Sequence, residues 1–443
     1  MNRYLNLRER FGQDLTPETV LGPLPQAELA IPESDRQRLR ALAARKHEIA
    51  CLPLMDERRR LWQDANDLKV GRPPVYVNEI CWMEIDDPAL KPLCTHPFAR
   101  ELESTLLEEL WCFDNQLGDV IVEDYIENPL VVYDSGFGID EVTDTVATEF
   151  NPDIVSRHFH ILIQDMNDVD KIQMPRVAVD RERTAQFGAL LRDIFSGVIN
   201  VLDVGSRGLW FTPWDYLIRV MGVEETMVNL MDQPEFVEAV VKRYVDCSME
   251  RMRLYNELGV WGSNNTSVRV GSGGYGHISC LDAAAMHPDH CPTSQMWGCG
   301  NAQIFSSVSP QMHWQFSLQY EMDWLRQFGV TYYGCCEPLS GKMDIMDKIP
   351  NLRKVSMSPW NDYARAAERC KGKYVMSCKP SPAVFATDHF DEDVVRSDLN
   401  AIFDATKGCA IELIMKDIST LRFDPQRLIR WAQIAREVIQ ERF

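Results

Sequence analysis

From Arg72 onward the chain alternates short apolar runs with longer amphipathic segments, and this alternation constrains the fold more than any other feature. Such a pattern is typical of repeated βα units around a parallel sheet. The apolar runs predict eight strands, at residues 75–80, 120–126, 198–204, 259–264, 331–336, 354–358, 374–378 and 410–415. Eight strands of this kind predict an α/β protein with a closed (β/α)8 barrel, the TIM-barrel class.

Helical periodicity separates most of the predicted strands. The helices are expected at residues 97–113, 224–258, 310–328, 362–370, 391–407 and 424–442. Residues 1–70 form a predicted N-terminal helical extension, in which Ser34 is a suitable N-cap for a long charged helix running towards Asp67. The barrel is then expected to occupy residues 71–443.

Two predicted connections, residues 127–180 and 265–308, are too long for simple βα loops and are expected to be functional or to carry small elements of their own. The second contains Gly271-Ser-Gly-Gly-Tyr-Gly276, without the Gly-Lys-Ser/Thr of a phosphate loop. We therefore expect a lid over the barrel mouth rather than a nucleotide site. Its Gly273 and Gly274 would fold close to a cofactor, with Tyr275 as a flat wall and Asn264 at the preceding strand end.

Charge and cysteine usage bound the function further. The formal net charge of -20 disfavours nucleic acids and anionic membranes as partners, because binding a phosphate backbone requires clustered Lys and Arg. The chain has no run of eighteen apolar residues and no secretory signal at its amino terminus, so a cytoplasmic location is expected. Thirteen scattered cysteines, an odd number, favour reduced thiols over a disulfide framework.

The most reactive residue types follow the strand predicted at residues 331–336. There the sequence Thr331-Tyr-Tyr-Gly-Cys-Cys-Glu-Pro-Leu339 places Cys335, Cys336 and Glu337 at the carboxyl end of a strand, where barrels of this class carry their active sites. Thiolates are favoured zinc ligands. Cys335 and Cys336 are therefore predicted to bind zinc, the alternative being ordinary buried small hydrophobic residues.

The last predicted strand adds charged groups to the same end. Strand alternation places Glu412 and Lys416 on one face, and we expect that face to point inward. Glu412 is then either a third metal ligand or half of a structural ion pair that fills the barrel. The predicted catalytic residues, expected around one cavity at one end of the barrel, are Glu337, Lys416, Asp203 and Glu79.

Three segments resemble the uroporphyrinogen decarboxylase superfamily over roughly residues 70 to 440. They are Arg72-Pro-Pro-Val75, Gly208-Leu-Trp-Phe-Thr-Pro-Trp-Asp-Tyr-Leu217 and Ser309-Pro-Gln-Met312. The resemblance implies a (β/α)8 barrel that catalyses either cofactor-free decarboxylation or zinc-dependent methyl transfer involving a corrinoid cobalt. The decarboxylase branch carries an Arg-Gln-Ala-Gly-Arg loop for propionate groups, whereas this chain has the acidic segment Asn78-Glu-Ile-Cys-Trp-Met-Glu84. A polyanionic porphyrinogen is therefore disfavoured as the substrate.

The methyltransferase branch ligates zinc through a His-x-Cys pair after the fifth strand and a further cysteine near the eighth. In this chain Tyr333-Gly-Cys-Cys-Glu337 keeps the cysteine and has tyrosine in place of histidine, and no cysteine ends the last strand. A carboxylate-containing set suits an oxygen substrate. The resemblance thus implies an O-demethylase component that moves a methyl group from a methoxylated aromatic substrate to a corrinoid.

The corrinoid is expected on a partner protein, because the chain contains no Asp-x-His-x-x-Gly motif. Two alternatives remain. One is decarboxylation of a smaller acid whose carboxylate is held by Lys379 or Lys416, and the other is a binding protein with a degenerate barrel. The direction of methyl transfer and a homodimeric state are left open by the sequence.

Overall fold

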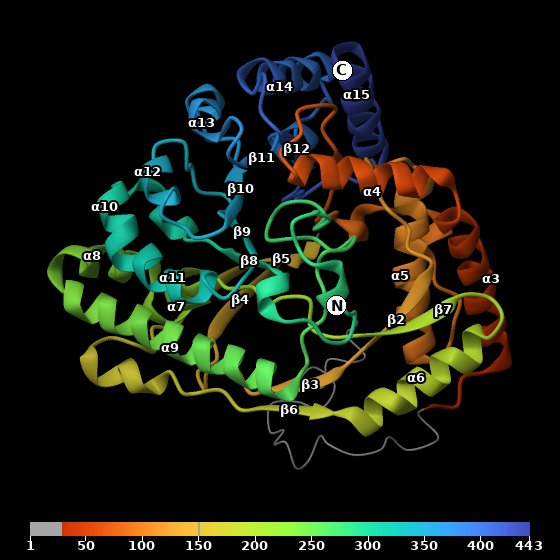
Figure 1. Cartoon of the computed structure of the whole chain (residues 1–443), viewed down its shortest axis with the longest axis horizontal. Coiled ribbons are helices and arrows are strands. Elements are labelled where there is room, and N and C mark those ends of the chain that lie inside the picture. The colour runs from red at the N-terminus through yellow and green to blue at the C-terminus, as the bar shows by residue number, and fades with distance from the viewer. Residues whose placement is uncertain (1–28, 149–150) are drawn as a thin grey trace.

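The computed structural model describes residues 29–148 and 151–443, and a curled parallel sheet of six strands lies at its centre (Figure 1). The strand order is β1-β12-β11-β10-β9-β8, and every neighbouring pair is parallel. The bounds are β1 Val75–Val77, β8 Trp297–Gly300, β9 Val330–Tyr333, β10 Leu352–Met357, β11 Val375–Cys378 and β12 Ile411–Met415.

A second parallel pair, β2 (Tyr125–Pro129) with β7 (Asn200–Val204), stands apart from this sheet. In the described part of the chain, the segment at residues 259–264 links the two parallel units through isolated contacts. A parallel bridge joins Ser206, just after β7, to Trp261, and the Asn264 side-chain amide bonds both the backbone N–H and the carbonyl of Trp297 in β8. The parallel strands of the expected barrel are thus present as a six-stranded sheet and a pair. A continuous eight-stranded ladder is not formed by the described residues.

Two strand predictions need correction. The strand expected at residues 120–126 begins only at Tyr125, as β2, and the segment at residues 259–264 makes a bridge at Trp261 but no named strand. In addition, β8 lies within the predicted lid. The sequence of β8, Trp-Gly-Cys-Gly, is too short and too rich in glycine to be recognised as a strand. The long connection at residues 127–180 does carry elements of its own. They form the antiparallel pairs β3 (Val131–Asp134) with β6 (Val177–Asp180) and β4 (Thr143–Thr148) with β5 (Asn151–Phe159).

Figure 1 shows helices distributed around the strands. Their bounds are α3 Glu33–Ala50, α4 Pro53–Asn66, α5 Pro97–Asp114, α6 Arg181–Phe195, α7 Pro213–Met221, α8 Val223–Asp232, α9 Pro234–Leu258, α10 Pro310–His313, α11 Gln319–Leu325, α12 Met343–Met346, α13 Tyr363–Cys370, α14 Glu392–Ala405 and α15 Gln426–Arg442. A π-helical turn, Trp314–Leu318, joins α10 to α11.

Proline explains two departures from the predicted helices. The helix expected at residues 224–258 is divided into α8 and α9, because Pro234 cannot continue the hydrogen-bonded ladder and instead starts a new helix. The single helix expected from Ser34 towards Asp67 is likewise divided into α3 and α4 at Pro53. Residue 32, also a proline, precedes the first turn of α3, so Ser34 lies inside that helix. Residues 1–28 of the predicted extension lie outside the described residues.

Helices α3 and α4 share one apolar core with α5 and α6. Trp62 of α4 is fully buried, donates a hydrogen bond from its indole nitrogen to the Asp119 carbonyl, and packs against Tyr275 with ring centroids 5.1 Å apart. The first helices therefore press directly on the glycine-rich segment. Within residues 29–148 and 151–443, no helix combines the length and apolar character needed to cross a membrane.

Candidate active site at the carboxyl ends of the strands

A cavity of about 1370 Å³ opens at the carboxyl ends of the parallel strands. Residues that immediately follow β1, β7, β9 and β12 line it, which is the edge where α/β folds bind ligands. The lining contributed by these strand ends includes Glu79, Arg207, Cys335, Cys336, Lys416 and Asp417. Three of the predicted site residues of the β9 and β12 ends, Cys335, Cys336 and Lys416, therefore share one cavity with Glu79.

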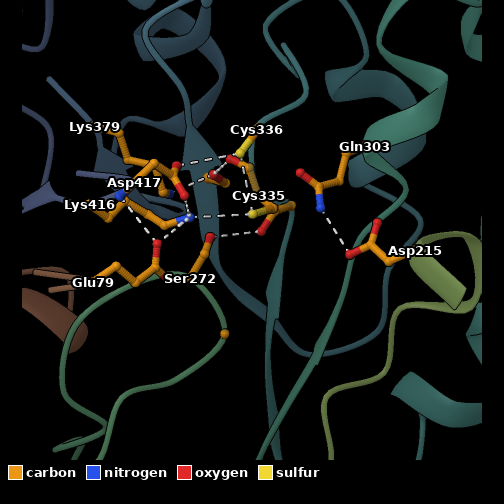
Figure 2. A network of polar contacts seen from close by, with 12 residues as sticks. Glu79, Asp215, Ser272, Gln303, Cys335, Cys336, Lys379, Lys416 and Asp417 are labelled. Carbon is orange, nitrogen blue, oxygen red and sulfur yellow. Dashed lines mark hydrogen bonds and ion pairs between the residues drawn. The ribbon is translucent and has the colours of Figure 1, made fainter. Parts of the chain in front are cut away.

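Lys416 is the centre of the polar cluster in this cavity (Figure 2). Its Nζ lies 2.9 Å from Asp417 Oδ1, 3.5 Å from Glu79 Oε2 and 3.7 Å from Cys335 Sγ. The side chain is only 4% exposed. Burial lowers the pKa of Lys416, but the surrounding anionic groups outweigh that effect and raise it above its usual value. The ammonium form is therefore firmly held at neutral pH.

Glu79 and Asp417 both have positive φ angles, 53° and 57°, a backbone conformation that residues other than glycine seldom adopt. These residues follow two adjacent strands, β1 and β12, and the Asp417 N–H donates to Glu79 Oε2 at 3.2 Å. Arg269 approaches the other oxygen of Glu79 at 2.8 Å. The two left-handed residues thus turn the chain so that both carboxylates face Lys416.

The two adjacent thiols lie side by side, with 3.6 Å between the Sγ atoms of Cys335 and Cys336. Hydrogen bonding from Cys336 lowers the pKa of the Cys335 thiol to about 7; burial opposes this shift and Lys416 supports it. The same pairing raises the pKa of Cys336, whose Sγ also lies 3.6 Å from Asp417 Oδ2. Cys335 is therefore the thiol that ionises first.

Glu337 lies behind the thiols rather than in the cavity. Its side chain is fully buried and accepts hydrogen bonds from the backbone N–H groups of Cys335, at 2.8 Å, and Ala302, at 3.1 Å. The structure thus places this predicted catalytic carboxylate where it shapes the turn that presents the two cysteines.

Glu412 does point towards the interior, but it lies deeper than the thiols. Its Oε2 atom is 2.6 Å from Lys354 Nζ, and both side chains are fully buried. Gly274 donates its backbone N–H to the other oxygen at 3.1 Å. Because both oxygens are occupied in this way, Glu412 forms the interior ion pair that was the alternative to metal binding.

The glycine-rich segment is not a lid, because it packs against the inner side chains of the sheet. A Cβ atom on Gly273 would lie 2.5 Å from Glu412 Oε1, and one on Gly274 would lie 2.1 Å from Trp62 Cζ3. Ser272 bonds the Tyr332 hydroxyl at 2.9 Å. Glycine is required here for close packing of protein on protein. The correction follows from tertiary contacts that the local sequence does not encode.

The other residues expected to hold a cofactor also serve the protein's own packing. Tyr275 is buried against Trp62, and Asn264 Nδ2 donates to the backbone carbonyls of Trp297 and Arg207. Gly273 and Gly274 are enclosed as described above. Only Asn264 of the four contributes to the cavity lining.

Asp203 does not join the cluster. Its carboxylate accepts from Arg192 of α6 and from Asn128 of β2, both at 2.7 Å, so it faces the helical layer. Strand β7 is partly exposed along most of its length. Its sequence therefore does not alternate between apolar and polar residues, and it does not indicate which face points inward.

Four residues around the cavity were missed as site residues, namely Asp417, Arg269, Asp215 and Gln303. Asp215 and Gln303 bond each other, with 2.9 Å between Gln303 Nε2 and Asp215 Oδ2 (Figure 2). A signal for Asp215 was available, because it lies inside the segment 208–217 on which the family resemblance rests. Arg269 and Gln303 lie in or beside loops whose course the sequence does not indicate.

A separate surface group could hold a metal ion. Cys51, at the end of α3, has its Sγ 3.9 Å from both ring nitrogens of His47, and His47 Nδ1 lies 2.5 Å from Asp124 Oδ1. Among the described residues this is the one group of three His, Cys, Asp or Glu side chains close enough to share an ion. It lies outside the residues that line the cavity.

A buried carboxylic acid lies behind the site. Glu321 is fully buried, and burial raises its pKa from an ordinary value near 4.5 to about 8, although hydrogen bonds with Ser317 and Tyr333 oppose the shift. The folded protein therefore retains a proton that the unfolded chain releases. This contribution to stability is complete below the unfolded pKa and is lost as pH rises through the folded value.

We expect Glu321→Gln to become progressively more stable than the original protein as pH rises from about 5 to about 8, by on the order of 3 kcal/mol, since each pKa unit corresponds to about 1.4 kcal/mol. The amide cannot ionise, so it carries no such penalty. Urea unfolding at several pH values measures the difference in free energy of unfolding between the variant and the original protein. Other groups titrate in the same way in both proteins, so their effects cancel. A difference that is independent of pH would contradict the neutral state of Glu321.

The fold and the site together define an α/β protein with a lysine, two thiols and two carboxylates at the carboxyl edge of a parallel sheet. No protein-family model matches the chain, and no curated protein matches it. Among solved structures it is similar to a methyltransferase from Methanosarcina mazei, with 12% sequence identity and a TM-score of 0.46, over 86% of this chain and 97% of that one. At this level of similarity neither activity nor residue roles carry over.

Proposed function

We propose that the protein is a methyltransferase that takes a methyl group from a methoxylated aromatic substrate and transfers it to the cobalt of a corrinoid carried by a partner protein. The observation that carries the proposal is the Lys416 ammonium, held beside two thiols and two carboxylates at the wall of a large cavity. The sequence resemblance to the corrinoid-dependent branch of the uroporphyrinogen decarboxylase superfamily supports the choice of methyl transfer.

The reaction needs help at the ether oxygen, because an alkoxide or phenoxide is a poor leaving group. As the bond from methyl carbon to oxygen breaks, the Lys416 ammonium hydrogen-bonds to that oxygen and stabilises the negative charge that develops on it, and the released phenoxide takes up a proton from water. The methyl carbon forms its new bond to cobalt(I) of the corrinoid substrate, which is thereby oxidised to cobalt(III). Glu79 and Asp417 keep Lys416 charged and oriented between turnovers.

The two adjacent thiols at the strand end have a spacing that would suit two ligands of one zinc ion. Two thiolates on one tetrahedral zinc lie about 3.8 Å apart, given Zn–S bonds of about 2.3 Å, and the Cys335 and Cys336 sulfurs are 3.6 Å apart. Asp417 Oδ2 lies 3.6 Å from Cys336 Sγ but does not form a three-ligand group with both thiols, so its carboxylate would have to move to act as the further ligand that the sequence assigned to Glu412. Bound zinc would supply a Lewis acid to the substrate oxygen.

The cavity suits a large second reactant. A volume of about 1370 Å³ exceeds the roughly 300 to 1,000 Å³ of most small-molecule pockets.

The decisive test is a reaction of the purified protein with a reduced corrinoid protein from the same source and vanillate, a methoxylated aromatic acid. We expect the cobalt(I) spectrum to be replaced by that of methylcobalt(III), with one demethylated phenol formed per cobalt. Release of carbon dioxide from the acid without any corrinoid would instead favour the decarboxylase alternative.

Metal analysis gives an independent prediction. We expect about one zinc per chain in anaerobically purified protein, and its loss when Cys335 and Cys336 are both changed to Ser, because a serine hydroxyl stays protonated and ligates zinc poorly. Cys280→Ser, at an exposed cysteine away from the cavity lining, is the matched control and should retain zinc. Zinc that persists in the double variant and is lost on Cys51→Ser would place the ion at the surface group instead.

A further inference from the structure

The cavity carries a carboxylate on the side opposite its lysine. Asp215, in the first turn of α7, lines the same cavity as Lys416. In Figure 2, Asp215 and Gln303 lie on the other side of Cys335 from Lys416 and Glu79. A substrate that spans the cavity therefore meets an ammonium at one end and a carboxylate at the other.

Asp215 differs from the other acidic residues of the cavity in having no basic partner. Each of the others pairs with a Lys or Arg within 4 Å, in the pairs Glu79–Arg269, Glu109–Lys46, Glu123–Arg59, Glu127–Arg207, Asp134–Arg251 and Asp417–Lys416. No ion pair within that distance involves Asp215 among the described residues; Arg219, one turn further along α7, pairs with Glu141 at 3.0 Å and acts on Asp215 only from a longer distance. Within that part of the chain, Asp215 is thus the one of these cavity carboxylates without a basic group in direct contact.

The surroundings of Asp215 increase its demand for a cation. Burial raises the pKa of Asp215, against the hydrogen bond from Gln303. Two fully buried carboxyl groups, Glu321 and Glu337, lie close enough to interact with it electrostatically, and Glu321 is the neutral acid described above. The buried Lys342 uses its Nζ on the Phe305 carbonyl and on His313. Asp215 is therefore a carboxylate whose charged form burial disfavours and a bound cation would stabilise.

One neutral side chain beside Asp215 also suits a cationic ligand. Trp210 lines the cavity next to Asp215, to which it can donate a hydrogen bond, and it is 47% exposed, so the face of its indole is available to a cation. Asn301, also next to the Asp215 carboxylate, is fully buried and does not line the cavity.

We propose that Asp215 and Trp210 form a subsite for a protonated amine, so that the physiological methyl donor is a methoxylated aromatic amine. The amine would supply the counter-charge that Asp215 lacks, while the methoxy oxygen reaches Lys416. The inference rests on the proposed methyl transfer for the placement of the methoxy group. The cation subsite itself is defined by binding and can be tested separately.

Vanillylamine and vanillate are matched probes, because they share the methoxyphenol ring and differ in a protonated amine against a carboxylate. Calorimetric titration without corrinoid should show vanillylamine binding to the original protein more tightly than vanillate. Asp215→Asn should weaken vanillylamine binding roughly thirtyfold or more, as expected when one partner of a buried charge pair is removed, and leave vanillate binding unweakened. Asp86→Asn, at an exposed carboxylate outside the cavity, should change neither.

Asp215→Glu keeps the charge and should retain the preference for the amine, which separates loss of charge from loss of folding. Equal affinities for the two probes, or an unchanged vanillylamine affinity in Asp215→Asn, would overturn the subsite. Demethylation of vanillate together with no binding of vanillylamine would overturn the subsite and leave the proposed function standing. Asp215-dependent amine binding with no methyl transfer from either probe would support the subsite and contradict the proposed methyl transfer.

Discussion

Lys416→Met is expected to reduce methyl transfer to the corrinoid by about a hundredfold or more, because removal of a charged hydrogen-bond donor that stabilises the leaving oxygen commonly has an effect of that size. Methionine keeps the length and most of the volume of the side chain, so the cavity wall is retained. The lost group is the buried ammonium that the surrounding anions hold in its charged form. Stopped-flow recording of the cobalt spectrum measures the rate.

Two controls define the meaning of that loss. Lys91→Met, at a lysine that is well exposed and outside the cavity, should leave the rate unchanged. The zinc content of Lys416→Met should remain that of the original protein, since Lys416 is not a proposed ligand. A variant that retains most of the rate would show that Lys416 has no part in the chemical step.

Gly274→Ala is expected to destabilise the protein by several kcal/mol, on the scale of about 1 to 3 kcal/mol or more found for overpacked cores. The added Cβ would lie 2.1 Å from Trp62 Cζ3 and 2.3 Å from Trp62 Cη2. The indole cannot easily retreat, because it is fully buried and bonded to the Asp119 carbonyl. The midpoint and slope of urea unfolding measure the change.

Gly71→Ala is the matched control, since a Cβ at that position meets nothing within 4 Å. It should leave the unfolding midpoint within experimental error of the original protein or raise it slightly, because alanine restricts the unfolded chain. Equal stabilities of the two variants would contradict the close packing of the glycine-rich segment on α4.

The sequence predicts the strand ends of β9 and β12 well, because their apolar runs are continuous and the residues that follow are chemically distinctive. The association of Cys335, Cys336 and Lys416 follows from one general property of parallel sheets, that carboxyl ends share an edge. Alternation also placed Glu412 on the inner face of β12. Its partner Lys354 lies on β10, fifty-eight residues earlier along the chain, so its pairing could not be inferred locally.

Predictions failed where the structure depends on distant contacts. Glycine is favoured both beside a ligand and beneath a tryptophan, and nothing in Gly271 to Gly276 indicates that Trp62 covers it. Asp203 lies at a strand end as expected, but it pairs with Arg192 of α6, and no helix was predicted at that position. The role proposed for Asp215 is not recognisable from the sequence, because its distinguishing property is that no basic side chain contacts it in the described part of the folded protein.

The left-handed residues Glu79 and Asp417 give the site a further property. Each holds a conformation that costs on the order of 1 to 2 kcal/mol relative to the common regions of backbone space. The pairing of β1 with β12 during folding offsets this unfavourable free energy, since their register brings the two turns together. The carboxylates are therefore in position before any substrate arrives, and the reorganisation that would otherwise slow every turnover has already taken place.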